Sequence, residues 1–262
     1  MKKNLNFAAI ILLLTAFCFA NVSKAMEPSR RYYLIKVYHY KTNTQEGKMD
    51  HYLKDAYLPA LRKITGETVG VFKSIDQQDT DKRIYVLITS SSHKKLEQLD
   101  EDLAKNAEYL ENAKDYINAP YDSAPYTRFE EIELYAFNGW KIPMVPQLTA
   151  SKADRVYELR SYESPTEKYG VNKIKMFNDG NEIGLFARLN FNAVFYAEVL
   201  SGSHMPNLMY LTAFNSKEDR DKHWDAFFGS PEWKKLIADP QYAHNVSKAD
   251  IIFLHPAEYS DF

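Results

Sequence analysis

An acid, a base and a phenol alternate along one short stretch of the chain. Glu158, Arg160 and Tyr162 are spaced two residues apart, which places them on one face of a β-strand, with Tyr157 and Leu159 on the other. A guanidinium beside a phenol can bind the anionic group of a small molecule. The same residues could instead form a ladder that only stabilises a sheet. We expect the fold to enclose the Glu158 face and the Tyr157 face to pack under helices.

Polar and aromatic side chains also lie on the other strands that the alternation predicts. Asn192, Tyr196 and Glu198 share one face of a strand expected over residues 192–200. If such faces line a barrel, they form a pocket for a small aromatic ligand bearing a carboxylate or phenolate, with Arg160 paired to the anion. The candidate ligand-binding residues are Glu158, Arg160, Tyr162, Asn192, Tyr196, Glu198, Tyr210, Lys36 and Tyr38.

No residue pattern specifies a reaction. Tyr196, Tyr210 and His204 are the candidates for catalytic acid–base groups, should the protein be an enzyme. The seven histidines show no metal-ligand spacing, and the chain has no H-E-x-x-H, P-loop, G-x-S-x-G or dinucleotide-binding glycine pattern. We therefore predict no metal site and no cofactor.

The N-terminus is typical of a secretory signal peptide. Lys2 and Lys3 precede an apolar run that is too short to span a membrane, and cleavage would follow Ala20 or Ala25. We expect residues 1–25 to be removed and the product to be periplasmic or extracellular, and not an integral membrane protein. A formal net charge of −2 also argues against a nucleic-acid partner.

Hydrophobic periodicity predicts the same order of elements, β-α-β-β-α-β, in each half of the chain. In the first half a loop over residues 41–48 precedes a helix over 49–64, which Pro59 interrupts and Gly66 ends. In the second half Ser164, Pro165 and Glu167 resemble a capping box. The expected strands cover residues 31–40, 69–75, 83–89, 128–137, 155–162, 192–200, 208–214 and 249–254. Two further helices are expected over residues 165–178 and 181–189, and two others are expected to follow Ser92 and Ser216.

The two halves share one sequence offset. Tyr33 lies 124 positions before Tyr157, and Ser92 lies 124 positions before Ser216. We expect two ferredoxin-like modules, at residues 30–137 and 155–262, joined by a linker at residues 138–154. Each antiparallel sheet carries helices on one face and leaves the other bare. The predicted fold is therefore α+β, with the two bare sheet faces packed together as a pseudo-dimeric α/β barrel.

Several longer motifs resemble bacterial NIPSNAP-family proteins. They are Tyr57-Leu58-Pro59-Ala60-Leu61-Arg62, Val69-Gly70-Val71-Phe72, Tyr157-Glu158-Leu159-Arg160, Tyr162-Glu163-Ser164-Pro165, Lys173-Ile174-Lys175-Met176-Phe177-Asn178, Glu182-Ile183, Met205-Pro206-Asn207-Leu208 and Ser230-Pro231-Glu232-Trp233. One departure is Asn181, because the family pattern has its glycine directly before Glu182 and this chain has it at Gly180. The resemblance implies the dimeric α/β-barrel superfamily, whose members include cofactor-independent monooxygenases, isomerases and haem-binding enzymes. It implies no settled catalytic chemistry.

Three functions stay open at this point. The first is an exported protein that binds a small aromatic or anionic molecule in the barrel. This function is also compatible with a homo-oligomer. The second is a cofactor-independent monooxygenase or isomerase, which requires an open cavity with Tyr196, Tyr210 or His204 converging on one point. The third is a protein-interaction module that works through its outer helices and has no small ligand.

Overall fold

The computed structural model describes residues 28–75 and 81–262, so the predicted signal peptide lies outside the described residues. Alternating apolar residues form eight strands, close to the predicted positions. In chain order they are β1 (Tyr32–Tyr40), β2 (Val69–Ser74), β3 (Lys82–Ser90), β4 (Arg128–Ala136), β5 (Val156–Glu163), β6 (Phe195–Ser201), β7 (Asn207–Phe214) and β8 (Lys248–Pro256). The segment between β4 and β5, which contains the predicted linker, has neither helix nor strand.

All eight strands join in one closed antiparallel barrel with the order β1-β3-β2-β8-β5-β7-β6-β4. The first four strands are ordered β4-β1-β3-β2 and the last four β8-β5-β7-β6, so each half is a ferredoxin-like module. The pairs β2–β8 and β4–β6 join the modules. Each module covers the edge strands of the other, so the described strands leave no open sheet edge.

The barrel interior is filled by apolar side chains from both modules. Tyr33 packs on Phe195 with ring centroids 5.0 Å apart, and Phe72 packs on Tyr157 at 4.9 Å. Other members of this core include Ile35, Val37, Leu87, Leu134, Leu159, Val199, Met209, Leu211 and Leu254. Burial of these surfaces, at about 25 cal/mol per Å², is the main free-energy term that holds the two sheets together.

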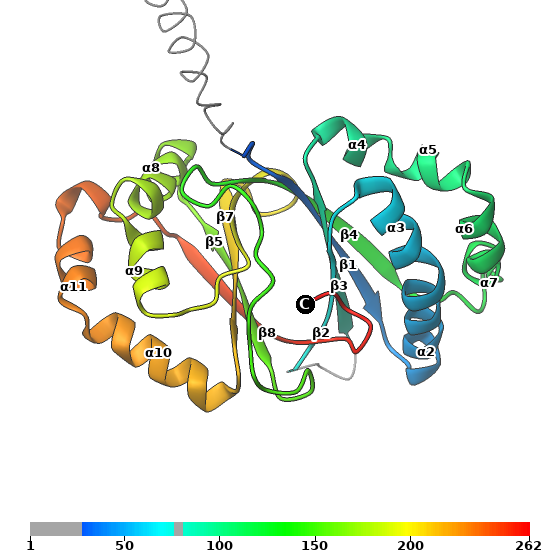
Figure 1. The fold of residues 1–262 in the computed structure, drawn as a ribbon. Coiled ribbons are helices and arrows are strands. Elements are labelled where there is room, and N and C mark those ends of the chain that lie inside the picture. The colour runs from blue at the N-terminus through cyan, green and yellow to red at the C-terminus, as the bar shows by residue number, and fades with distance from the viewer. Residues whose placement is uncertain (1–27, 76–80) are drawn as a thin grey trace, which may run out of the picture.

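Helices cover the outer faces of the two sheets, on opposite sides of the barrel (Figure 1). The first module carries α2 (Asn43–Tyr52), a π-helical turn η1 (Leu53–Tyr57), α3 (Leu58–Thr65), α4 (His93–Glu97), α5 (Leu99–Ala104), α6 (Ala107–Asn112) and α7 (Lys114–Ile117). The second carries α8 (Glu167–Asn178), α9 (Glu182–Arg188), α10 (Lys217–Gly229), α11 (Pro231–Ile237) and a 3₁₀ turn η2 (Pro240–Tyr242). Within the described residues, no helix is both long and apolar enough to cross a bilayer.

Local signals account for most helix boundaries, with two corrections. The loop expected at 41–48 is wrong, because Thr42 and Gln45 form a capping box that starts α2 at Asn43. The capping box expected at Ser164 is also wrong, because α8 begins at Glu167 after Thr166. The predicted break near Pro59 appears as the π-helical turn η1, and Gly66 ends α3 with a left-handed φ of 72°.

The predicted orientation of the sheet faces is reversed. Tyr157 and Leu159 belong to the barrel interior, whereas Tyr162 and Tyr210 pack with the helices of the second module. The expectation that the Glu158, Arg160 and Tyr162 face lines the barrel is therefore wrong. Apolar alternation identified which residues share a face, but both faces of this sheet are buried.

The C-terminal segment packs back onto β2 of the first module. The Asp261 carboxylate accepts hydrogen bonds from Arg62 (2.6 Å to Nη2) and from the Val69 backbone amide (2.8 Å). Phe262, 1% exposed, lies against Phe72 in the barrel core. The last residue of the described chain therefore contributes to barrel packing.

We predict that Phe262→Ala lowers the free energy of unfolding by about 3–5 kcal/mol, because it removes a buried aromatic ring from the barrel core. Urea unfolding followed by circular dichroism measures the effect. Phe228→Ala is the control, since Phe228 is 50% exposed and its removal should cost less than half as much. Equal losses for the two variants would contradict the packing role of Phe262.

Candidate functional site

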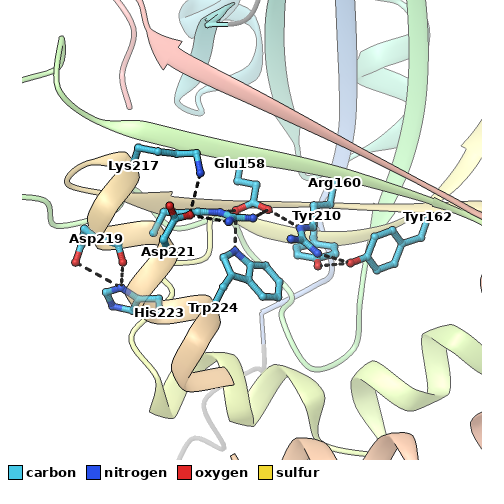
Figure 2. A network of polar contacts seen from close by, with 10 residues as sticks. Glu158, Arg160, Tyr162, Tyr210, Lys217, Asp219, Asp221, His223 and Trp224 are labelled. Carbon is cyan, nitrogen blue, oxygen red and sulfur yellow. Dashed lines mark hydrogen bonds and ion pairs between the residues drawn. The ribbon is translucent and has the colours of Figure 1, made fainter. Parts of the chain in front are cut away.

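Glu158 is the centre of a buried polar network between the second sheet and α10 (Figure 2). Its carboxylate is 0% exposed and accepts four hydrogen bonds. Arg160 donates from Nε at 2.6 Å, Arg220 from Nε at 2.7 Å and from Nη2 at 2.9 Å, and Trp224 from Nε1 at 2.8 Å. Four donors on one carboxylate compensate the loss of its hydration.

A second branch of this network leads from Arg160 to two tyrosines. Arg160 Nη1 donates to the Tyr162 hydroxyl at 2.7 Å, and the hydroxyls of Tyr162 and Tyr210 are 2.9 Å apart. The guanidinium of Arg160 also lies 3.7 Å from the ring centroid of Trp224. Arg160 is therefore paired with Glu158 and stacked on an indole, which does not support the expected pairing of Arg160 with an anionic ligand.

Burial and charge act in opposite directions on Glu158. Desolvation raises the pKa of its carboxyl, but the hydrogen bonds and positive charges of Arg220 and Arg160 outweigh desolvation and hold the pKa below its ordinary value. The pKa of the Tyr210 phenol shifts in the opposite direction. Burial and the nearby Tyr162 raise it well above the ordinary value. Glu158 is thus charged and Tyr210 neutral near pH 7.

Helix α10 supplies three of the four donors, from two residues on one face. Ser216 starts this helix by accepting a hydrogen bond from the Asp219 backbone amide, as expected from its sequence. Arg220 and Trp224 are four residues apart and so share one side of the helix. Neither Arg220 nor Trp224 is among the site residues predicted from the sequence, although their four-residue spacing is a signal that could have identified them.

A buried ion pair joins α8 to α9 on the same side of the sheet. Lys173 Nζ lies 2.9 Å from Glu182 Oε2, and both residues are buried. Asn181, where the NIPSNAP pattern has a glycine, precedes α9 with a left-handed φ of 60°. Asparagine is one of the few other residues that adopts this conformation readily, which explains how the departure is tolerated.

The remaining predicted site residues lie elsewhere. Glu198 pairs with Arg30 at 2.9 Å near the junction of β4 and β6. In the first module, Lys36 pairs with Glu131 at 2.8 Å, and Tyr38 packs in that module's helix-side core. These residues do not join the Glu158 network in a common pocket.

His204 is not close to the candidate tyrosines. It lies on an exposed turn, with Nδ1 3.2 Å from the Glu163 carboxylate. Across residues 28–75 and 81–262, no cluster of three or more His, Cys, Asp or Glu side chains has the arrangement of a metal site.

A cavity of about 220 Å³ opens between the linker, α9 and the start of β6. Two predicted residues line it, Tyr196 and Asn192. Asn192 precedes β6 and has a left-handed φ of 47°, so the expectation that it shares a strand face is wrong. The other lining residues are Trp140, Met144, Val145, Pro146, Gln147, Phe186, Ala187, Asn190 and Ala193. The linker has no periodicity, so the sequence carried no signal for its part of this wall.

The hydroxyl of Tyr196 is buried and has no hydrogen-bond partner among the described residues. The Tyr196 ring is 0% exposed and lies between Trp140, in an edge-on contact at 5.7 Å, and Tyr210, stacked at 5.5 Å. Burial and the nearby Glu182 carboxylate raise the pKa of Tyr196 well above its ordinary value. A buried hydroxyl without a partner costs about 1–3 kcal/mol, so this hydroxyl is an unsatisfied polar group of the second module.

We predict that Glu158→Gln lowers the free energy of unfolding by about 3–5 kcal/mol at pH 7, because Arg160 and Arg220 lose their shared carboxylate. Because folding lowers the pKa of Glu158, its carboxylate stabilises the folded state in full above the unfolded-state pKa. This stabilisation is lost as the pH falls through the folded-state pKa. The difference between the wild type and the variant should therefore shrink at pH values below the ordinary glutamate pKa. Denaturant titrations at several pH values measure it, and a constant difference down to pH 2 would contradict the assignment.

Comparison with solved structures shows the same overall fold. A protein proposed as a monooxygenase from Lactobacillus acidophilus is 12% identical, with 87% of this chain and 94% of that chain covered at a TM-score of 0.53. A second protein proposed as a monooxygenase, from Fusobacterium nucleatum, is 8% identical, with 87% and 93% covered at a TM-score of 0.51. An anthrone oxidase-like protein is 10% identical, with 87% and 92% covered at a TM-score of 0.50. At these identities the likeness concerns the fold alone.

Sequence comparison is more specific for the second module. No curated protein matches the chain. The family model described as NIPSNAP matches residues 157–261, which extend from β5 through β8. The match includes Glu158, Arg160 and the whole helix layer above them. Residues 157–261, which form the second half of the barrel, are therefore similar to the NIPSNAP family.

Proposed function

We propose that the protein binds a small aromatic molecule in the cavity lined by Tyr196, between the linker and the second module. The single observation that carries this proposal is the buried Tyr196 hydroxyl, which lacks a partner among the described residues although its side chain lines a cavity. Trp140 and Phe186 supply aromatic walls, and Asn192 supplies an amide. This combination of apolar walls and few polar groups is typical of small-molecule sites.

The size and charge of the cavity narrow the ligand class. A volume of about 220 Å³ suits one substituted ring and is below the usual range for larger cofactors. The walls carry amides and Tyr196 but no Lys, Arg, His, Asp or Glu among the described lining residues. The proposed ligand is therefore a neutral monocyclic phenol, ketone or quinone whose oxygen accepts a hydrogen bond from Tyr196.

The geometry favours binding over proton-transfer catalysis. A cofactor-independent monooxygenase or isomerase requires a group that removes a proton from the substrate. The raised pKa values of Tyr196 and Tyr210 keep both phenols protonated, so they donate hydrogen bonds rather than act as bases near neutral pH. His204 lies on an exposed turn, so the three candidates do not converge on one point.

The proposal has two further parts, export and duplication of the module. The basic start and apolar run within residues 1–25 indicate export to the periplasm or the extracellular space. The shared order of strands and helices supports a duplicated module, with residues 30–137 as a NIPSNAP-like copy of residues 155–262. We therefore propose that the protein is exported, contains two such modules and functions in binding.

We predict that Tyr196→Phe weakens ligand binding about five- to tenfold, the loss expected for one hydrogen bond, without lowering stability. Thermal-shift screening of phenols, aromatic ketones and quinones, followed by calorimetry of the hits, measures both quantities. Removal of an unpaired buried hydroxyl should leave the free energy of unfolding unchanged or raise it.

Tyr57→Phe is the matched control for this experiment. Tyr57 is equally buried, and its hydroxyl also lacks a partner among the described residues, but it packs in the first module. Its substitution should leave affinity unchanged. The proposal fails if no neutral aromatic compound binds, or if both substitutions weaken binding to the same extent.

A further inference from the structure

Each module carries an open cleft on its helix layer, away from the Tyr196 cavity. The first measures about 710 Å³ and lies between α2 and the segment that runs through α7 toward β4. The second measures about 590 Å³ and lies between α8 and the segment that runs through η2 toward β8. Both volumes fall within the range typical of small-molecule sites.

The two clefts occupy equivalent places in the two modules. Gly47 and His51 are the fifth and ninth residues of α2, and Val171 and Lys175 are the fifth and ninth residues of α8. On the opposite wall, Pro120 lies eight residues before the start of β4, and Pro240 lies eight residues before the start of β8. The clefts are therefore one feature of the module that occurs twice.

In each module, a side chain at the same helix position donates hydrogen bonds to the opposite segment. Lys48, the sixth residue of α2, donates from Nζ to the backbone oxygen of Ser123 at 2.9 Å and to its hydroxyl at 2.8 Å. Asn172, the sixth residue of α8, donates from Nδ2 to the backbone oxygen of Gln241 at 2.6 Å and to Asn245 Oδ1 at 3.0 Å. Each pair of hydrogen bonds fixes the separation between the first helix of its module and the opposite wall.

The two linings also share their chemistry. The first contains Lys48 and Lys114 against Asp115, together with His51 and the Tyr116 ring. Among the described residues, Lys48 donates only to neutral oxygens, whereas Lys114 pairs with Glu111 in an exposed contact of little net energy. His51 contacts Asp55, which stands outside the lining.

The second lining repeats this pattern with different residues. It contains Lys168 and Lys175 against Glu167, together with His244 and the Tyr169 ring. Neither lysine has an ion-pair partner in the part of the chain that the structure describes. Each cleft therefore combines an aromatic ring with at least one ammonium group that has no carboxylate partner among the described residues.

We propose that these paired clefts bind small organic anions, each formed of one ring that carries a carboxylate or phosphate group. The ammonium groups would pair with the anion and the tyrosine ring would pack on the ligand ring. This binding is independent of the Tyr196 cavity, whose described lining carries no charged side chain. The two sites would give a stoichiometry of two anions per chain.

Calorimetric titration with phenyl phosphate tests the proposal. Gly47→Phe should close the first cleft without disturbing the fold, because a Cβ atom at Gly47 has no neighbouring atom within 4 Å. Val171→Phe should close the second cleft from a position that is 56% exposed. Each variant should retain one of two phenyl phosphate sites, and the double variant should bind at least tenfold more weakly.

The controls separate cleft blocking from other effects. Gly47→Ala and Val171→Ala should keep both sites, and Tyr196→Phe should leave the stoichiometry at two. Phenol and inorganic phosphate should each bind at least tenfold more weakly than phenyl phosphate, because each lacks one half of the recognised group. The proposal is overturned if phenyl phosphate does not bind, if binding survives in the double variant, or if inorganic phosphate binds equally well.

Discussion

The burial of two bare sheet faces against each other is the constraint on which the rest of the structure depends. Each ferredoxin-like module covers only one face of its sheet with helices, and the other face must leave water by contact with a second sheet. The contacts of Tyr33 with Phe195 and of Phe72 with Tyr157 are the direct result. Pairing of β2 with β8 and of β4 with β6 then satisfies the edge strands. Because apolar side chains occupy the barrel, polar groups of the same strands are placed under the helices.

That placement determines the chemistry available to the second module. A charged side chain between a sheet and a helix layer needs partners from the helices, since water does not reach it. Arg220 and Trp224 of α10 provide them for Glu158, and Arg160 completes the set. The network is thus closed upon itself. The Tyr196 cavity lies on the same side of the sheet but is bounded by the linker, and there a polar group is left without a partner among the described residues.

The sequence was sufficient to predict the fold, but not which face of each sheet points into the barrel. Alternation grouped Glu158 with Arg160 and separated both from Tyr157, and the repeated offset predicted the two modules. Neither observation could choose the inward face, because tyrosines and aliphatic residues are compatible with either environment. The choice depended on α10, where Arg220 and Trp224 approach from a distant part of the chain. The cavity wall from Trp140 to Gln147 was beyond prediction for another reason, since an irregular segment is positioned by its tertiary contacts.

Comparison of the modules shows what the fold itself requires. The position equivalent to Glu158 in the first module is Leu34, which lies in an apolar helix-side core, and the position equivalent to Arg220 is Leu96 in the same core. The same place in the module therefore accommodates either a charged network or buried leucines. Buried ion networks rarely stabilise a fold more than well-packed apolar residues of similar volume. Stability alone does not explain a carboxylate with two guanidinium partners in the second module, so the network is better understood as a device that holds α10 and the Tyr162–Tyr210 pair in one arrangement. Since Tyr210 stacks on Tyr196, that arrangement also positions the Tyr196 ring in the wall of the cavity.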